Sequence, residues 1–375
     1  MHCCIVEWDE NCVCDITDMS ERRSIFILFI GLMLCISLWI SLQDIQELHT
    51  EYTSYDPLEL LNSVNNSTTS LNLISNTTAS SEWAFKNDTT TLIDLKNFEY
   101  LINQAPCSDD FKWHGDMNTI NKLPIVLVLI HSAPRNWHKR NVIRETWGYK
   151  DRRARIFFLL GAVKSTQTQI RLKQENDMFQ DLIQGNFFDA YRNMTYKHTM
   201  ALKWFVYNCP KLKYLIKTDD DVFVNTPAVY DLLEAGFNNE NLIFCYRIED
   251  ARIKRTYRSK WRVSTKEFSG RYYPNYCPGF SIIYSSDVVL RLYKEAQQTP
   301  YFWIDDVHIT GTLAQHLNLN ITTLGKYYLN SIQLNDLITD KLHLSSIEPM
   351  FLFAEPNIHE EQIRALWNTV NNSYR

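Results

Sequence analysis

The chain lacks the short motifs that usually mark nucleotide-binding and hydrolytic proteins. Its 375 residues contain no Walker-type glycine loop and no G-x-G-x-x-G, the two common cradles for nucleotide phosphates. Neither G-x-S-x-G nor H-E-x-x-H occurs, so the serine-hydrolase and zinc-protease classes have no motif support. No internal repeat is visible.

A basic excess is missing as well. The chain has 38 Lys and Arg against 43 Asp and Glu, a net charge of -5, which gives no electrostatic footprint for nucleic acid. With 45% hydrophobic residues, the chain is long enough to bury one large core or two smaller ones.

Charged residues are absent from "IFILFIGLMLCISLWISL", residues 25–42. At about 1.5 Å per residue a helix of this length spans roughly 27 Å, enough for a thin bilayer. The run continues into "QDIQELH" without the small residues of a cleavage site, so we interpret it as an uncleaved signal anchor. Arg22 and Arg23 precede it and the next basic residue is Lys86, which predicts a cytoplasmic tail (1–24) and a lumenal body.

The segment after the anchor, residues 43–106, is rich in Ser, Thr and Asn and has no sustained period, as is typical of a stem. N-glycosylation sequons support the lumenal assignment, and they begin at Asn65, Asn66, Asn76, Asn87, Asn193, Asn320 and Asn371. A lumenal domain is predicted over 107–375.

Four cysteines fall in that domain: Cys107, Cys209, Cys245 and Cys277. An even number in an oxidising compartment predicts two disulfides, with three possible pairings. The N-terminal cysteines have no partners at zinc-site spacing, and we assign them no role.

Short apolar runs alternate with helical patterns after residue 107. "IVLVLI" (125–130), "IFFLLG" (156–161), "KYLIK" (213–217) and "FSIIY" (280–284) are typical of strands buried on both faces. Helices are expected over 195–209, 226–236, 285–297, 308–319 and 359–370, with Thr226 as the N-cap of the second. This alternation predicts an α/β domain with a mainly parallel central sheet.

The strand "KYLIK" ends in three aspartates, Asp219, Asp220 and Asp221. Because side chains alternate along an extended chain, Asp219 and Asp221 should point the same way and Asp220 away. Two carboxylates at about 4 Å repel by roughly 4 kcal/mol at an effective dielectric near 20, and a bound Mg²⁺ or Mn²⁺ would offset that repulsion. The alternative is a solvated acidic turn.

A second acidic pair, Asp305 and Asp306, precedes a predicted helix in "FWIDDVHITG". Two carboxylate clusters in one domain suggest that one binds metal and the other handles a proton. A helix cap is the alternative for this pair.

Six blocks carry a resemblance to a known family. "VIRETWG", "IFFLLG", "NFFDAYRNMTYKHTMALKWFVYNC", "YLIKTDDDVFVN", "YYPNYCPGFSIIYSSDVV" and "IDDVHITG" occur in the order seen in the β-1,3-galactosyl- and N-acetylglucosaminyltransferases. The chain resembles this family over roughly residues 122–370.

The resemblance implies roles for named residues. Asp219, Asp220 and Asp221 would bind Mn²⁺ (or Mg²⁺) and a UDP-sugar, with Asp219 and Asp221 as the metal ligands. In the family's E-D-V block, Asp305 stands for the Glu, and Asp306 would be the catalytic base.

The same blocks have implications for four further residues. Arg144 would lie near the nucleotide, with a structural ion pair as the alternative, and Trp147 belongs to the core. The resemblance also implies a Cys209–Cys277 bridge.

The chain departs from the family pattern in two places. It has "YCPGFS" where the family usually has Y-C-S-G-G, which puts the substrate fit near Gly279 in question. A metal-binding His that the family tends to carry late in the chain corresponds here to Ala354 or its neighbours, with His359 offset.

The resemblance implies a GT-A-like α/β sandwich in a type II Golgi membrane protein. The implied reaction is an inverting transfer of galactose from UDP-galactose to the 3-hydroxyl of an acceptor glycan on protein or lipid. Two alternatives stay open: transfer of N-acetylglucosamine from UDP-GlcNAc, and a catalytically silent, membrane-anchored glycan-binding homologue.

Overall fold

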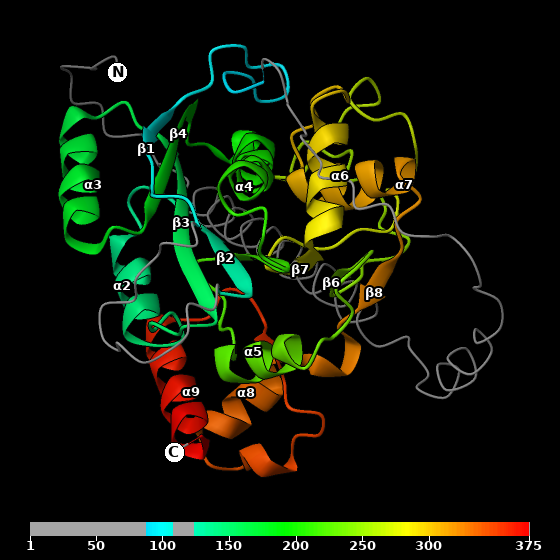
Figure 1. The fold of residues 1–375 in the computed structure, drawn as a ribbon. Coiled ribbons are helices and arrows are strands. Elements are labelled where there is room, and N and C mark those ends of the chain that lie inside the picture. The colour runs from blue at the N-terminus through cyan, green and yellow to red at the C-terminus, as the bar shows by residue number, and fades with distance from the viewer. Residues whose placement is uncertain (1–87, 108–123, 375) are drawn as a thin grey trace, which may run out of the picture. The chain divides into compact units, whose positions relative to one another are not determined.

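An eight-stranded sheet runs through the described part of the protein in the order β1-β4-β3-β2-β5-β7-β6-β8 (Figure 1). The computed structural model describes residues 88–107 and 124–374. The strands are β1 (Tyr100–Ile102), β2 (Val126–His131), β3 (Ala154–Ala162), β4 (Leu182–Phe188), β5 (Tyr214–Asp219), β6 (Ile243–Cys245), β7 (Ser281–Ser285) and β8 (Ile321–Thr323). A separate parallel pair joins β9 (Tyr328–Leu329) to β10 (Phe353–Ala354).

The four strands predicted from apolar runs are confirmed as β2, β3, β5 and β7. All six residues of β2 are buried, as expected for a strand covered on both faces. The centre of the sheet, from β4 to β5, is parallel. Beyond it β7 runs antiparallel to both β5 and β6, so the apolar run at 280–284 indicated a buried strand but not its direction.

Helices cover both faces of this sheet. They are α2 (Trp137–Glu145), α3 (Thr166–Phe179), α4 (Met194–Asn208), α5 (Thr226–Glu234), α6 (Ser286–Ala296), α7 (Ala314–His316), α8 (Ser331–Ile338) and α9 (Glu360–Ser373). A π-helical stretch, η2 (Val307–Leu313), leads directly into α7, and three short 3₁₀ turns are η1 (Tyr191–Asn193), η3 (Gly325–Tyr327) and η4 (Leu344–Ser346).

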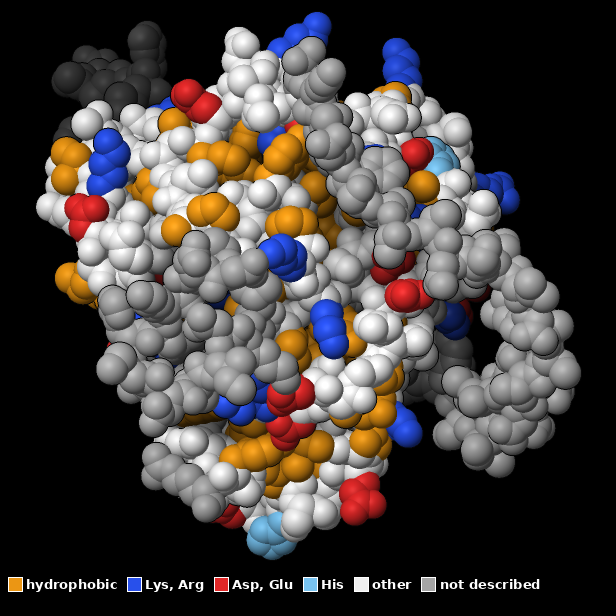
Figure 2. Space-filling view, in the orientation of Figure 1, with side chains coloured by type: hydrophobic (Ala, Val, Ile, Leu, Met, Phe, Trp, Pro, Cys, Tyr) orange, Lys and Arg blue, Asp and Glu red, His pale blue; other side chains and the backbone are white. Residues whose placement is uncertain are grey.

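Alternate residues of β2 enter two different cores. Val126, Val128 and Ile130 pack in the cluster that contains the buried residues of α2, α5, α8 and α9. Leu127 and Leu129 pack in the cluster that contains those of α4 and α6. The domain is therefore a three-layer α/β/α sandwich, built on the period of two along a strand. Figure 2 shows Lys and Arg side chains interspersed with Asp and Glu on one face of it.

The predicted helix starting near Thr226 begins one residue from the predicted cap. Asn225 is the N-cap of α5, and its side chain accepts a hydrogen bond from the Ala228 N–H, while Thr226 is inside the helix. Asn and Thr are both good caps, so the sequence did not distinguish them. The Thr226 hydroxyl instead donates to the Trp147 carbonyl, and Trp147 is fully buried in the core as predicted.

The predicted stem boundary at residue 106 is wrong for residues 88–106. β1 pairs antiparallel with β4, and Leu92, Phe98 and Ile102 are buried in the cores of the sandwich. Lys203 of α4 donates to the Asp88 carboxylate at 3.0 Å. These apolar residues are too widely spaced to form the long runs by which the other strands were found. The rest of the predicted stem, the anchor and the tail lie outside the described residues.

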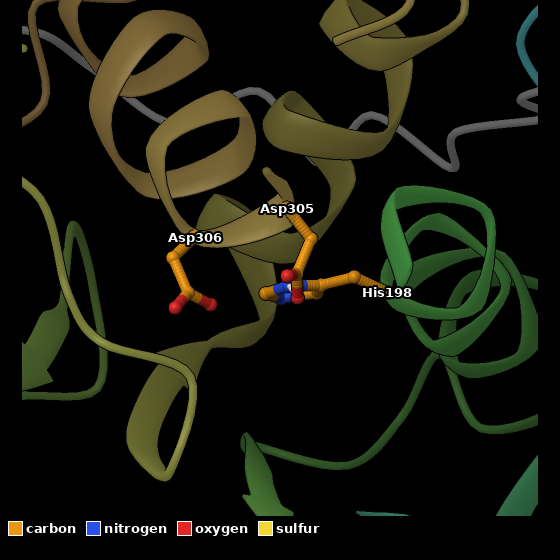
Figure 3. A group of neighbouring side chains, drawn as sticks. All are labelled: His198, Asp305 and Asp306. Carbon is orange, nitrogen blue, oxygen red and sulfur yellow. Dashed lines mark hydrogen bonds and ion pairs between the residues drawn. The ribbon is translucent and has the colours of Figure 1, made fainter. Parts of the chain in front are cut away.

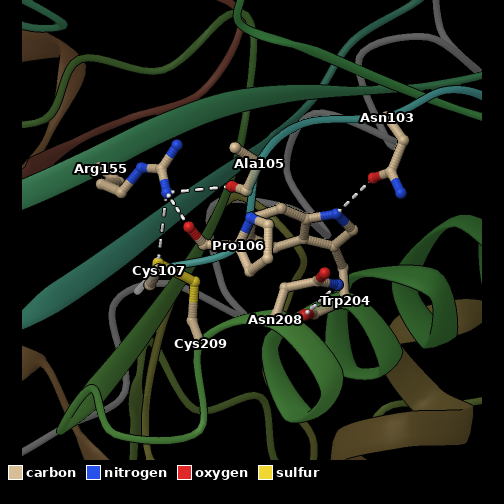
Figure 4. Close-up of a disulfide and its surroundings, with 8 residues drawn as sticks. All are labelled: Asn103, Ala105, Pro106, Cys107, Arg155, Trp204, Asn208 and Cys209. Carbon is tan, nitrogen blue, oxygen red and sulfur yellow. Dashed lines mark hydrogen bonds between the residues drawn. A yellow bond between two sulfur atoms is a disulfide. The ribbon is translucent and has the colours of Figure 1, made fainter. Parts of the chain in front are cut away.

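The two predicted disulfides are present, but the preferred Cys209–Cys277 pairing is wrong. Cys107 pairs with Cys209, and Cys245 pairs with Cys277. Cys209 directly follows α4, and the Cys107 N–H donates a hydrogen bond to the Asn208 carbonyl at the end of that helix. The Trp204 indole N–H of α4 donates to the Asn103 side-chain oxygen at 2.9 Å (Figure 4). Cys245 lies on β6 and Cys277 on the segment leading to the neighbouring β7, so the sheet brings this second pair together.

We expect peptide mapping of the non-reduced protein to recover 107–209 and 245–277 as the linked pairs. Replacing both Cys245 and Cys277 with Ser should lower the free energy of unfolding by about 2–5 kcal/mol, because a 32-residue loop loses its cross-link. Recovery of a 209–277 peptide would overturn the observed pairing.

Among the described residues no helix is long and apolar enough to cross a membrane. The predicted span at 25–42 lies outside them.

Candidate active site

The aspartate run lies where the parallel strands end. Asp219 is the last residue of β5 and is aligned with His131, the last residue of β2. The Asp220 N–H donates to the His131 carbonyl, which continues the ladder one residue further. In open α/β sheets ligands bind beyond this carboxyl edge.

The three aspartates differ in exposure, and because β5 ends at Asp219 the strand alternation does not extend to Asp220 and Asp221. Asp220 points inward: its carboxylate accepts from the Ser132 hydroxyl at 2.7 Å and the Asn136 amide at 2.8 Å, and its side chain is 8% exposed. The side chains of Asp219 and Asp221 are 33% and 26% exposed. Asp220 therefore holds the loop between β2 and α2, whereas Asp219 and Asp221 are more exposed: Asp219 Oδ1 lies 2.9 Å from Lys217 Nζ, and Asp221 Oδ2 lies 3.7 Å from Lys139 Nζ.

Lys217 is a buried cation beneath the aspartates. Its ammonium donates to the Asp219 carboxylate at 2.9 Å and to the Gly279 carbonyl at 2.5 Å. The side chain is almost fully enclosed, so its charge must be matched by nearby carboxylates. Despite its burial, the pKa of Lys217 is raised by the charges of Asp219, Asp305 and Asp306, which keeps it protonated.

Desolvation in this recess raises the pKa of Asp219 to about 6, and the charges of Asp221 and Asp305 add to the effect. Desolvation also raises the pKa of Asp221, with a contribution from Asp220. Two partly exposed carboxylates that carry excess negative charge are the oxygen ligands Mn²⁺ and Mg²⁺ prefer. The residues present therefore fit a divalent cation.

Asp305 and Asp306 are at the start of the helical stretch η2, and their side chains extend from it side by side (Figure 3). Asp305 lies against His198 of α4, whose Nδ1 is 3.1 Å from its Oδ2. His198 Nε2 is 3.1 Å from the Tyr284 hydroxyl. Both contacts are satisfied when Nδ1–H donates to Asp305 and Tyr284 donates to Nε2, which leaves the imidazole neutral.

The two neighbouring carboxyls have opposite pKa shifts. Although burial opposes ionisation of Asp305, the hydrogen bond from His198 and the charge of Lys217 lower its pKa. Burial, followed by the charge of Asp305, raises the pKa of Asp306 well above its usual range. Adjacent carboxyls whose environments push their pKa values apart are typical of acid–base sites. The structure does not support the helix-cap alternative for Asp306, which is at the N-cap position of η2 and makes no side-chain cap hydrogen bond.

His198, Asp305 and Asp306 each have one side-chain atom that could bind a metal ion, and these three atoms lie within 4.8 Å of one another. The Asp305 oxygen nearest His198 already accepts its hydrogen bond.

Gly279 connects the two acidic groups. A Cβ at this position would stand 2.5 Å from Asp306 Oδ1 and 2.5 Å from Lys217 Nζ, so only glycine lets them approach the loop backbone. The family departure at "YCPGFS" therefore keeps the one residue on which the packing of Lys217 and Asp306 depends.

We expect Gly279→Ala to lower turnover by about 100-fold, because a shift of about 1 Å in a reacting group has that effect. Overpacking should also lower the free energy of unfolding by about 1–3 kcal/mol. Steady-state kinetics together with thermal unfolding would check both effects. Unchanged turnover would show that the side chains of Lys217 and Asp306 can shift to make room for the added methyl group without affecting catalysis.

Arg144 makes the structural ion pair that was the alternative to a nucleotide contact. Its guanidinium donates to Asp181 at 2.8 Å and to Glu175 at 2.8 Å, and it stacks 4.0 Å from the centroid of the Phe179 ring. These partners tie α2 to α3 and raise the pKa of Arg144 despite its burial. A nucleotide contact by Arg144 stays a prediction.

The late segment with the missing His approaches the aspartate run. The Ala354 N–H donates to the Phe223 carbonyl and the Ile358 N–H to the Asp221 carbonyl. Ala354 is fully buried and offers no ligand atom, and His359 is exposed at the N-cap of α9. The segment thus holds the backbone of Asp221 in place through the hydrogen bond from Ile358.

Sequence reasoning missed His198 and Lys217 as members of the site, and it flagged the loop at Gly279 only for substrate fit. Lys217 carried the clearest signal, because a lone Lys inside an apolar strand must find a carboxylate partner. His198 had no local signal, since its role depends on Asp305 far away in the chain.

Comparisons with known proteins bear on this site. A family model described as galactosyltransferase matches residues 138–325, half of the chain. Beta-1,3-galactosyltransferase 1 of Homo sapiens is 31% identical over 239 residues, covering 62% of this chain and 70% of the relative. Beta-1,3-galactosyltransferase 5 of Mus musculus is 32% identical over 205 residues, covering 53% and 66%.

Two solved structures were also matched. A glycosyltransferase involved in the glycosylation of the major capsid of PBCV-1 has 10% identity and a TM-score of 0.33, covering 64% of this chain and 98% of that one. The apo structure of the bifunctional glycosyltransferase WbbM has 12% identity and a TM-score of 0.36, covering 66% and 50%. The sequence matches carry the assignment. The chain belongs to the galactosyltransferase family and is a glycosyltransferase of its β-1,3 group.

Proposed function

We propose that the protein is an inverting, metal-dependent hexosyltransferase. It moves galactose from UDP-galactose to the 3-hydroxyl of an acceptor sugar on a glycoprotein or glycolipid, forming a β-1,3 linkage. The observation that carries the proposal is the pair of acidic groups on either side of Lys217 and Gly279: the partly exposed Asp219 and Asp221 on one side, and Asp306, packed against Gly279, on the other.

The chain's own residues divide the work. Asp219 and Asp221 hold the divalent cation, Mn²⁺ or Mg²⁺, and Asp220 holds the β2–α2 loop in place beside them. When bound, the cation supplies positive charge that neutralises the leaving UDP. Lys217 links this group to the Gly279 loop that packs against Asp306.

Asp306 takes the proton of the acceptor 3-hydroxyl as that oxygen attacks the anomeric carbon. A carboxylate with a raised pKa is a stronger base at neutral pH, provided that it is ionised. Asp305 is held ionised by His198, so it adds negative charge beside Asp306 rather than competing for the proton. Since family donors are α-linked and products β-linked, one direct displacement inverts the anomeric centre.

Two alternatives are separated by one assay. The same residues accommodate UDP-GlcNAc as donor, and Ala354 in place of the expected metal-binding His favours a silent glycan-binding homologue. Turnover of UDP-galactose and UDP-GlcNAc should be compared with and without Mn²⁺, using the full chain from a eukaryotic secretory host. Mn²⁺-dependent transfer of galactose would support the proposal. Transfer of N-acetylglucosamine would instead support the UDP-GlcNAc alternative, and the absence of any transfer would support the silent glycan-binding homologue.

The membrane topology forms part of the proposal. Residues 25–42 would anchor the protein in the Golgi membrane, with the tail 1–24 in the cytosol and the glycosyltransferase domain in the lumen. The charge-free run and the Arg22–Arg23 pair support this orientation.

We expect glycosidase treatment to increase the protein's gel mobility, because several of its seven sequons should be glycosylated in the lumen. A protein from a eukaryotic secretory host should be compared before and after treatment. An unshifted band would argue against a lumenal domain.

A further inference from the structure

Positive charge is concentrated in one segment between β6 and β7. Residues 247–273 contain nine Lys and Arg against three Asp and Glu, although acidic residues outnumber basic ones in the whole chain. A local field of one sign raises the concentration of oppositely charged ligands. The segment has no long strand or helix, only isolated bridges from Ile248 to Tyr276 and from Arg252 to Tyr272.

This segment packs directly against the start of the Asp305–Asp306 stretch. Ile253 and Val263 share a small core with Phe302, Trp303 and Val307. Trp303 is two residues before Asp305, so the shared core holds the basic segment beside the proposed catalytic base.

Large aromatic rings are exposed on this segment and beside it. Tyr257 is 88% exposed, Trp261 is 45% exposed, and Tyr191 of η1 is 52% exposed. The Trp261 indole N–H donates to the Tyr191 hydroxyl at 2.6 Å, and the Tyr191 ring lies 6.0 Å from that of Trp303. Exposed Trp and Tyr clusters are typical of ligand-binding surfaces, because they bury apolar area and keep a polar edge for hydrogen bonds.

The Trp303 contact places Tyr191 near the reacting groups, because Trp303 is two residues before Asp305 and its ring lies 6.0 Å from that of Tyr191. An acceptor hydroxyl that gives its proton to Asp306 must lie within hydrogen-bond reach of that carboxylate. The remainder of the acceptor can then extend over Tyr191 and Trp261.

Two cations on this surface face aromatic rings. The Lys260 ammonium is 4.2 Å from the centroid of the Trp261 ring, and the Arg262 guanidinium is 4.0 Å from that of Tyr257. Within residues 88–107 and 124–374, neither makes an ion pair with a carboxylate. Two other basic groups nearby are engaged by the protein itself: Arg255 donates to three backbone carbonyls, and Arg192 pairs with Glu267 at 2.9 Å.

We propose that Tyr191, Tyr257, Lys260, Trp261 and Arg262 form the acceptor-binding surface, and that the preferred acceptor is an anionic glycan. The aromatic rings stack on sugar faces, and the two cations pair with a carboxylate or sulfate on a neighbouring sugar. This inference rests on the proposed transferase function and adds the chemical class of its acceptor. Uronate, sialate and sulfate esters share the anionic chemistry.

The test uses the full chain and three hexasaccharides: N-acetyllactosamine repeats, the same repeats carrying 6-sulfates, and hyaluronan with its glucuronates. Binding is measured by calorimetry without donor, and transfer is measured with UDP-galactose and Mn²⁺. We expect at least one anionic hexasaccharide to bind about tenfold more tightly than the neutral one at low salt, with the difference shrinking at high salt. Preference for sulfate or for uronate identifies the source of the charge.

Three variants complete the design. Lys260→Gln, alone and with Arg262→Gln, should remove the anionic preference and leave neutral binding and UDP affinity unchanged. Trp261→Ala should weaken binding of neutral and anionic glycans alike. Lys173→Gln, the same charge change on the exposed face of α3, should have no effect.

The outcomes separate this inference from the proposed function. Anionic preference in binding without any transfer would support the surface and overturn the transferase activity. Transfer to a neutral acceptor with no anionic preference in binding or turnover would overturn the inference alone. An anionic preference that survives the Lys260 and Arg262 changes would also overturn it, because other residues would then supply the charge.

Discussion

Asp306→Asn should lower turnover at least about 100-fold, the typical contribution of a general base. Asn keeps the size of Asp306 and removes its basicity. The affinity for UDP and metal should change little, because Asp219 and Asp221 lie at and just after the end of β5, whereas Asp306 is at the start of η2. Donor binding should be measured by calorimetry and turnover under saturating donor.

Asp305→Asn is the matched control and should be milder. Its carboxylate faces His198 rather than an acceptor, and Asn can still accept the hydrogen bond from Nδ1 (Figure 3). A larger loss at Asp305 than at Asp306 would show that the proton transfer belongs to the first aspartate.

The dependence of kcat/KM on pH is a second measurement that compares Asp305→Asn with the wild type. Because the pKa of Asp306 is raised, its base form is lost as the pH falls through that raised value, and kcat/KM should decline on the acid side. The charge of Asp305 is part of the cause, so Asp305→Asn should move the acid limb to lower pH. An acid limb that does not move in Asp305→Asn would rule out this electrostatic coupling.

Asp221→Ala should weaken Mn²⁺-dependent UDP binding by more than about 100-fold, since losing a direct ligand costs more than losing an outer-shell partner. Only Asp219 would then remain of the two partly exposed carboxylates. Calorimetric titration of UDP in the presence of Mn²⁺ would measure the loss.

Stability distinguishes a metal ligand from a structural residue at this position. The raised pKa of Asp221 means that its charge opposes folding at neutral pH, so the metal-free variant should be as stable as the wild type or more stable. Asp177→Ala, on the exposed face of α3, is the control and should leave UDP binding unchanged. Unchanged UDP–Mn²⁺ affinity in Asp221→Ala would remove Asp221 from the metal site.

Local patterns determined much of this protein in advance. The apolar runs predicted β2, β3, β5 and β7, because a strand covered on both faces is apolar throughout. The apolar run before the aspartates predicted that they follow a buried strand, and Asp219 is the last residue of β5. The motif blocks predicted the family that the comparisons show. Each of these depends on residues close together in sequence.

Contacts between distant segments were decided only by the tertiary structure. The cysteine pairing depended on which segments the sheet and α4 bring together, and the direction of β7 on its neighbours. Asp305 differs from Asp306 because His198, 107 residues earlier, reaches only the first of them. Burial and neighbouring charge set the basicity of a carboxyl, and both are properties of the folded surroundings rather than of the residue, so the sequence could name the two aspartates but not divide their roles.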